Sequence, residues 1–217
     1  MPVDHETGYC AQMISAVDAL ERLREGNRRF VSGESANDVA TSHLQRPDMA
    51  SGQNPFAIVL ACSDSRVPTE LIFDQGIGDL FVIRVAGNIV APSQIGSIEY
   101  AATQFGTRLV VVLGHSNCGA VIATLKELAK KDDHRSPNLR AIVDRVRPAV
   151  EPVLREHKDS DSEFVIGEAV RANVRASVAR LQHGSLIIEN LINERELQIA
   201  GAEYSIETGV IEFLEDD

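Results

Sequence analysis

The stretch FAIVLACSDSR (residues 56–66) begins as a continuous apolar run and ends on Cys62, Asp64 and Arg66. An apolar run of this length is typical of a strand that is buried on both faces of a sheet. Its polar end has two interpretations. Ser and Asp are common turn residues, so the end of the run is an ordinary turn in one interpretation. In the other, it is half of a metal site whose remaining ligands lie elsewhere in the chain.

Two further apolar runs decide the fold class. DLFVIRVAG (79–87) follows closely, and RLVVVLGH (108–115) comes after a helical pattern around SIEYAATQFG (97–106). Buried strands that alternate with helices predict an α/β fold. We expect a mostly parallel central β-sheet with helices on both faces.

The rest of the chain adds helices and a sheet edge. Residues 33–55 are rich in Gly, Ser, Asn and Pro and predict a long connection, and the acidic run 155–163 predicts a solvated loop. The strands expected at 197–205 and 210–214, joined by the turn ETG, predict an antiparallel C-terminal edge. Apolar residues at helical spacing predict helices over 14–31, 118–131, 163–182 and 185–196, and another that starts at Pro137 with Ser136 as its N-cap.

The composition is that of a single soluble domain. The 217 residues are 44% hydrophobic and 24% charged, so the chain can bury a substantial core. The net charge of −11 argues against a nucleic-acid partner, because phosphates would be repelled without a basic face. No stretch reaches the roughly 20 apolar residues that span a bilayer. The polar, acidic start lacks the pattern of a secretory signal, so we expect a cytoplasmic protein with no membrane partner.

A second pair of candidate ligands follows the third apolar run. His115 ends that run, and Cys118 lies three residues later at the start of a helix. The carboxyl ends of neighbouring parallel strands meet at one edge of a sheet, so the C-x-D and H-x-x-C pairs could converge there. Zinc prefers thiolate and imidazole, whereas magnesium and calcium prefer oxygen. A helix N-terminus beside Cys118 would favour its thiolate, while Cys10, in a polar tail, is interpreted as an incidental thiol.

Three segments carry a specific resemblance. CSDSRVPTELIFDQGIGDLFVIRVAGN, SIEYA and GHSNCGAV, in this order and spacing, resemble the β-class carbonic anhydrases. The match is tight over residues 53–123 and looser at GNRRF and IAGAEYSIETGVIEFL. It implies one domain over 1–217, with an N-terminal helical arm (1–34), a zinc-site core (53–123) and C-terminal helices and edge strands (163–217). Val85 is a departure, because many members have Asn there.

The resemblance implies a cofactor and a ligand set. One Zn²⁺ per subunit would be bound by Cys62, His115 and Cys118. The fourth position would hold water, or Asp64 in a resting state. Arg66 would hold Asp64 away from the metal through a charge-assisted pair, so that both residues have catalytic roles.

The implied reaction is the reversible hydration of CO2 to bicarbonate and a proton. Zinc lowers the pKa of bound water to about 7, and the resulting hydroxide attacks the carbon of CO2. The implied substrate-binding residues are Gln53, Phe81, Tyr100 and Gly119. In relatives, the first three come from the neighbouring subunit, so we expect a homodimer or tetramer.

The resemblance also bears on the resting state. Some relatives ligate Asp64 to zinc, and their bicarbonate pocket uses a Trp shortly before the first ligand Cys. This chain has no Trp, and Val59 stands at that position. Because Gln53 is present as well, we expect the open, plant-like form at neutral pH.

Two other functions are compatible with the same ligands. The first is a carbon disulfide hydrolase, and the second is a binding or scaffold module with a structural zinc, in which Asp64 would be the fourth ligand. No histidine is identified as a proton shuttle, and His5, His43, His134, His157 and His183 are interpreted as surface or core residues. The basic residues of the N-terminal helix are expected to dock on an acidic partner subunit; they are Arg22, Arg24, Arg28 and Arg29.

Overall fold

The computed structural model describes residues 14–35, 50, 52–130, 136–157, 159 and 161–215. Its centre is a five-stranded sheet with the strand order β2-β1-β3-β4-β5. The pairs from β2 to β4 are parallel and β5 is antiparallel to β4, which confirms the fold class expected from the sequence. The strands span Ala57–Ala61 (β1), Leu80–Arg84 (β2), Leu109–His115 (β3), Gln198–Tyr204 (β4) and Ile211–Phe213 (β5).

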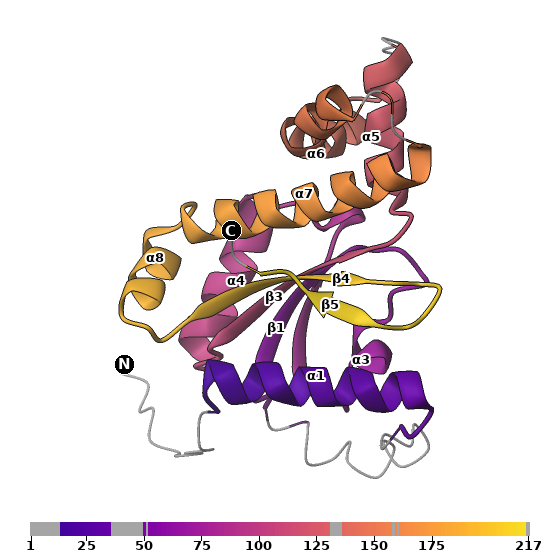
Figure 1. Ribbon diagram of the computed structural model, residues 1–217. Coiled ribbons are helices and arrows are strands. Elements are labelled where there is room, and N and C mark those ends of the chain that lie inside the picture. Colours follow the sequence, from indigo (N-terminus) through magenta and orange to yellow (C-terminus); the bar gives the residue numbers. More distant parts are fainter. Residues whose placement is uncertain are drawn as a thin grey trace.

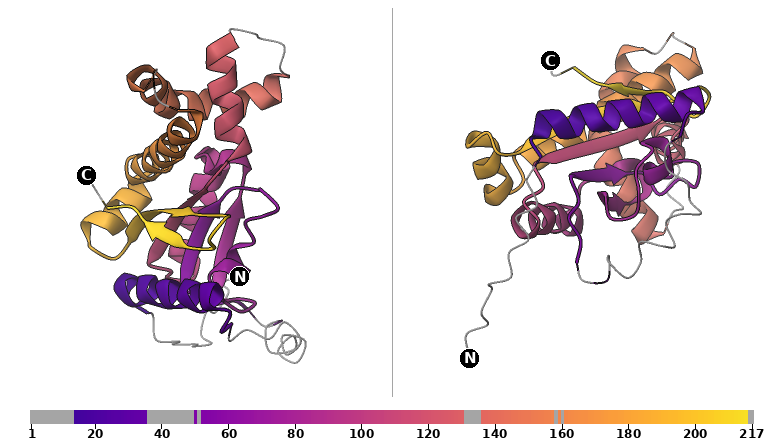
Figure 2. Two further views of the ribbon diagram at one scale, coloured as in Figure 1. Left: turned by 45° about the vertical axis from the view of Figure 1, so that its right-hand side comes forward. Right: turned by 90° about the horizontal axis from the view of Figure 1, so that it is seen from below.

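Helices cover both faces of the sheet. α1 and α3 pack on one face, and α4, α7 and α8 pack on the other (Figure 1). Two further views show α5 and α6 beyond the carboxyl ends of the strands (Figure 2). The helices span Ala16–Ser32 (α1), Thr69–Ile72 (α3), Pro92–Gln104 (α4), Gly119–Lys130 (α5), Pro137–Glu156 (α6), Ser162–Gln182 (α7) and Leu186–Asn193 (α8), and Ala86–Asn88 form a 3-10 turn (η2).

The two faces of the sheet have separate cores. Every residue of β1 and β3 is buried, and successive side chains point to opposite faces. Val59 therefore belongs to the same cluster as Leu23 of α1, whereas Leu60 belongs to the cluster that contains Val174 of α7. Burying one such side chain contributes about 1.5–3 kcal/mol, so the unbroken apolar runs stabilise both layers at once.

The N-terminal helix α1 packs on its own chain. Leu23 is fully buried against the sheet. Arg22 pairs with Asp79 at 2.9 Å, and Arg29 pairs with Asp74 at 2.6 Å. Both remaining arginines of the helix, Arg24 and Arg28, contact Glu21. Each of these arginines therefore has an acidic partner within its own chain, and their docking on a partner subunit stays a prediction.

Several boundaries differ from the expected ones. α4 begins at Pro92, before the expected start at residue 97, because proline is well suited to the first helical position. α6 continues to Glu156 through Pro148 and Pro152, although each proline removes a helical hydrogen bond. Its buried valines explain why the helix persists. They are Val143, Val146 and Val150.

Some expectations concern other parts of the chain. The acidic run 155–163 is only partly a loop, because α6 ends at Glu156 and α7 begins at Ser162. His157 packs edge-on against Phe164.

Among the described residues, no helix has the length and apolar character needed to cross a bilayer. Expectations for Cys10, His5, His43 and His134 lie outside the described residues.

Candidate metal centre

The two candidate ligand pairs meet at the carboxyl edge of the sheet. Cys62 directly follows β1, His115 is the last residue of β3, and Cys118 immediately precedes α5. β1 and β3 are neighbours in the sheet, yet the chain leaves β1 for β2 on the other side. Ligands of open α/β sheets bind at such a topological switch point, which explains why residues far apart in the chain converge here.

The geometry of the three side chains fits a metal ion. The ligand atoms of Cys62, His115 and Cys118 all lie within 4.8 Å of one another, and all three residues are buried. His115 Nδ1 lies 2.9 Å from the carbonyl oxygen of Ser116, which can only accept, so Nδ1 carries the hydrogen. Nε2 therefore presents a lone pair, and it is buried with no hydrogen-bond partner. Two sulfurs and one imidazole nitrogen suit zinc and not magnesium or calcium.

The surroundings stabilise negative charge on sulfur. A hydrogen bond from Cys118 lowers the pKa of Cys62, and the N–H of Gly87, 3.3 Å away, acts in the same direction against burial. The pKa of Cys118 is raised because it hydrogen-bonds to Cys62 and is itself buried. One of the two thiols is thus readily deprotonated, and a bound divalent cation would favour deprotonation of the other.

Asp64 and Arg66 stand beside this cluster and bind each other. Arg66 Nε donates to Asp64 Oδ1 at 2.9 Å, and its Nη2 donates to Oδ2 at 2.8 Å. The Arg66 guanidinium holds the pKa of the Asp64 carboxyl well below its usual range. Asp64 Oδ2 lies 3.9 Å from His115 Nε2, which is too far for a hydrogen bond. The carboxylate is therefore near the three ligand atoms but is held by the arginine.

Arg84, which the sequence analysis did not identify, fixes the loop that carries Cys62 and Asp64. Its Nε donates to the carbonyl oxygen of Cys62 at 3.1 Å, and its Nη2 donates to that of Asp64 at 2.6 Å. The available signal was a charged residue at the end of an apolar strand, at the level of Ala61 in β1. Val85, the departure from the family pattern, packs partly buried against the apolar clusters beside this loop.

The expected substrate-binding residues fall into two groups. Gly119 is exposed at the first position of α5, directly after Cys118. Phe81 pairs with Ile58, four residues before Cys62, which places it about 13 Å along the sheet from the ligands. Gln53 precedes β1 and is exposed.

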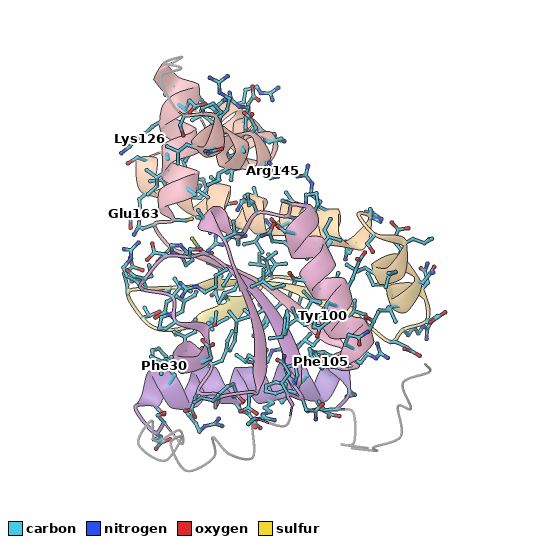
Figure 3. All side chains as sticks on the ribbon, turned by 180° about the vertical axis from the view of Figure 1, so that it is seen from behind. Phe30, Tyr100, Phe105, Lys126, Arg145 and Glu163 are labelled. Atoms are coloured by element: carbon cyan, nitrogen blue, oxygen red, sulfur yellow. The ribbon has the colours of Figure 1, made fainter. Side chains whose placement is uncertain are left out.

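Tyr100 belongs with Phe81 at this far end of the sheet. The Phe81 and Tyr100 rings lie 6.3 Å apart, and Tyr100 contacts Phe105 edge-on at 5.4 Å. Figure 3 shows Tyr100 on the lower part of α4 and Phe105 just after the end of that helix, both far from Lys126 of α5. Within one chain, the structure therefore brings together the ligands, Asp64, Arg66 and Gly119, but not Gln53, Phe81 and Tyr100.

Fold and site together define an α/β protein with a cysteine–histidine cluster at its switch point that fits a metal ion, and comparison with known proteins gives its family. A family model described as carbonic anhydrase matches residues 57–211. Carbonic anhydrase 2 of Mycobacterium tuberculosis is 40% identical over 195 residues, which cover 89% of this chain and 90% of the relative.

Solved structures of the same family share the fold. The β-carbonic anhydrase CcaA is 29% identical, with a TM-score of 0.72 over 90% of this chain and 95% of that chain. A chain of one of the tetrameric β-carbonic anhydrases of Sordaria macrospora is 26% identical to this chain, with a TM-score of 0.68. The match covers 87% of this chain and 98% of that chain. This chain belongs to the carbonic anhydrase family, and within it to the β class.

Proposed function

We propose that this protein catalyses the reversible hydration of carbon dioxide to bicarbonate and a proton, with one Zn²⁺ per subunit. Cys62, His115 and Cys118 would hold the ion. The observation that carries the proposal is the buried lone pair of His115 Nε2, which lacks a hydrogen-bond partner and faces two sulfurs. A bound zinc ion supplies a water whose pKa is lowered to about 7, which makes a nucleophile available at neutral pH.

Asp64 and Arg66 would orient the attacking water. Asp64 is ionised, so its Oδ2 can accept a hydrogen bond from the attacking water while it stays bound to Arg66. This fixes the direction in which the oxygen lone pair points. A water reacts faster when it is held in the correct orientation within hydrogen-bonding distance. The bidentate pair therefore contributes to catalysis by positioning the attacking water.

The same pair supports the open resting form. Arg66 binds both carboxylate oxygens and would compete with the metal for Asp64, whose Oδ2 lies 3.9 Å from His115 Nε2. Val59 supports the same form, because the position that carries Trp in the closed relatives is here a fully buried apolar side chain on the α1 face. We therefore assign the chain to the open, plant-like subtype.

The substrate pocket requires a second copy of this chain. Carbon dioxide is uncharged, so its pocket should be mainly apolar, as Phe81 and Tyr100 are. Tyr100 is 52% exposed, and both rings lie at the end of the sheet opposite to the ligands of their own chain. In a homodimer, or a tetramer built of dimers, these rings and Gln53 would complete the partner's site. A cytoplasmic location fits the free thiols of Cys62 and Cys118, which a reducing compartment keeps available.

The test combines metal analysis with rapid kinetics. The wild type should contain one zinc per chain and accelerate CO2 hydration in stopped-flow measurements at mildly alkaline pH. Cys62→Ser should lose both, whereas Asp64→Asn should keep the zinc and lose most of the activity. Zinc-loaded wild type that does not accelerate hydration over buffer would indicate a structural metal, and sulfide release from CS2 in its place would indicate the hydrolase.

A further inference from the structure

The turn between β4 and β5 lies against the two residues that separate His115 from Cys118. The N–H of Ser116 donates to the carbonyl oxygen of Tyr204 at 2.9 Å, and the N–H of Ile206 donates to Ser116 Oγ at 3.0 Å. The segment between the two ligands is thus attached to a part of the chain that follows it by about ninety residues.

One carboxylate in this turn binds both residues of the segment. Ser116 Oγ donates to Glu207 Oε2 at 2.8 Å, and Asn117 Nδ2 donates to Glu207 Oε1 at 3.1 Å. Ser205 Oγ also donates to Oε2, at 3.3 Å. Hydrogen bonds to a charged acceptor are about twice as strong as neutral ones, so this carboxylate is the main side-chain contact of the segment.

Both residues that Glu207 binds determine the position of site groups. The carbonyl oxygen of Ser116 accepts the hydrogen bond from His115 Nδ1, which sets the orientation of the imidazole. Asn117 has φ 55°, in the left-handed region, and this conformation turns the chain toward Cys118. Its carbonyl oxygen also accepts from Arg66 Nη2 at 3.5 Å. A change in the conformation of this segment would therefore move the His115 imidazole, the Cys118 thiol and the Arg66 guanidinium.

We propose that Glu207 is a positioning residue for the metal centre: its carboxylate holds the segment Ser116–Asn117 so that His115 and Cys118 stay in the geometry that binds the ion. Its effect is on metal retention, through residues that touch the ligands, and it does not contact substrate. The inference extends the proposed metal site but does not depend on which reaction that site catalyses.

The experiment measures zinc release and metal geometry in the full-length zinc-loaded protein. The variants are Glu207→Ala, which removes both acceptors, and Glu207→Gln, which keeps one acceptor oxygen. Zinc release to an excess of chelator should be about 10-fold faster in Glu207→Ala, in the range known for groups that orient metal ligands, and intermediate in Glu207→Gln. In cobalt-substituted protein, the visible absorption bands should shift in the same order.

Two controls separate positioning from general stability. Glu189→Gln, on α8 at the other end of the fold, makes the same chemical change and should leave zinc release and the cobalt spectrum as in the wild type. Zinc release from the double variant Ser116→Ala/Glu207→Ala should be slower than the product of the two single effects predicts, because the hydrogen bond from Ser116 Oγ to Glu207 is lost in both single variants.

Several results would overturn the assignment. Zinc release within 2-fold of the wild type in Glu207→Gln and Glu207→Ala, with or without a lower melting temperature, would make Glu207 a structural turn residue only. If Glu207→Ala does not fold, Glu207→Gln decides alone. None of these readouts requires CO2 hydration, so a protein that retains zinc through Glu207 but does not hydrate CO2 would refute the proposed reaction and leave this inference standing.

Discussion

Arg66 binds both carboxylate oxygens of Asp64, and the two residues are separated by only one position in the chain. The backbone N–H of Arg66 adds a third hydrogen bond, to Oδ1 at 3.0 Å. The arginine thereby directs the carboxylate away from His115 Nε2, to which Oδ2 comes no closer than 3.9 Å. This short-range contact holds an anionic group beside the three candidate ligands, and in the proposed open form it would keep that group from becoming a fourth ligand.

Replacement of Arg66 should convert Asp64 from an orienting group into a metal ligand. In Arg66→Ala the carboxylate loses two charge-assisted hydrogen bonds, and the nearest alternative partner for it is the metal. We expect kcat/KM for CO2 hydration to fall about 100-fold, comparable to the loss of one stabilising donor in an active site. A crystal structure of the zinc-loaded variant should show an Asp64 oxygen bonded to zinc in place of water.

The conservative variant Arg66→Lys provides the control. Lysine keeps the charge but cannot make the paired contact of a guanidinium, so its activity should lie between those of the wild type and Arg66→Ala. If Arg66→Ala kept wild-type activity and an unchanged zinc coordination shell, the proposed role of the pair would be wrong.

The sequence predicts the fold and the ligands for reasons that are local. β1 and β3 are apolar runs. Cys62 directly follows the first, His115 ends the second and Cys118 lies three residues later, so the carboxyl edge of the sheet could be derived from neighbouring residues alone. Arg84 and Glu207 could not be found in this way, because their partners lie 22 and 91 positions away in the chain. The extent of α6 was missed for a similar reason, since burial of Val150 outweighs the local effect of Pro148 and Pro152.

Gly114, directly before His115, should tolerate no side chain. A Cβ at this position would lie 2.5 Å from Val174 Cγ2 and 3.3 Å from Val170 Cγ1. Overpacking of this kind costs about 1–3 kcal/mol, so Gly114→Ala should lower the free energy of unfolding by that amount in urea titration. Val174→Ala in the same chain should recover part of the loss, because it removes the methyl group that clashes.

Gly167→Ala is the matched control for this prediction. Gly167 lies inside α7, and a Cβ there would meet nothing within 4 Å. Because alanine is favoured over glycine in a helix by about 0.5–1 kcal/mol, this variant should be more stable than the wild type. Equal stability changes in the two variants would contradict the packing argument.

Glu203 should make the stability of the fold depend on pH. It lies directly opposite Glu212 on β5 and binds Arg171 Nε at 2.9 Å. Burial raises the pKa of Glu203, and the charge of Arg171 only partly opposes this. A carboxyl whose folded pKa exceeds its unfolded value contributes stability below the unfolded pKa, and this contribution is lost as pH rises through the folded pKa.

Urea unfolding between about pH 4 and pH 7 would check this sign. The free energy of unfolding of the wild type, relative to that of Glu203→Gln, should decrease as pH rises across this window. Glu212→Gln removes the opposing negative charge, so the decrease should be smaller in that background. A relative stability that increased with pH would mean that Arg171, and not burial, dominates at Glu203.

Two inactive variants should complement each other if each site is built from two chains. Cys62→Ser removes a metal ligand, and Gln53→Ala removes a substrate contact that would act on the partner's site. In a co-expressed mixture, half of the dimers contain both kinds of chain, and each of these has one intact site, so activity should return to about a quarter of the wild-type value. Cys62→Ser mixed with Cys118→Ser should stay inactive, because neither chain can hold the metal. If the first mixture also stayed inactive although mass spectrometry showed mixed dimers, Gln53 would not act on the partner's site, and the pocket would have to be formed within one chain.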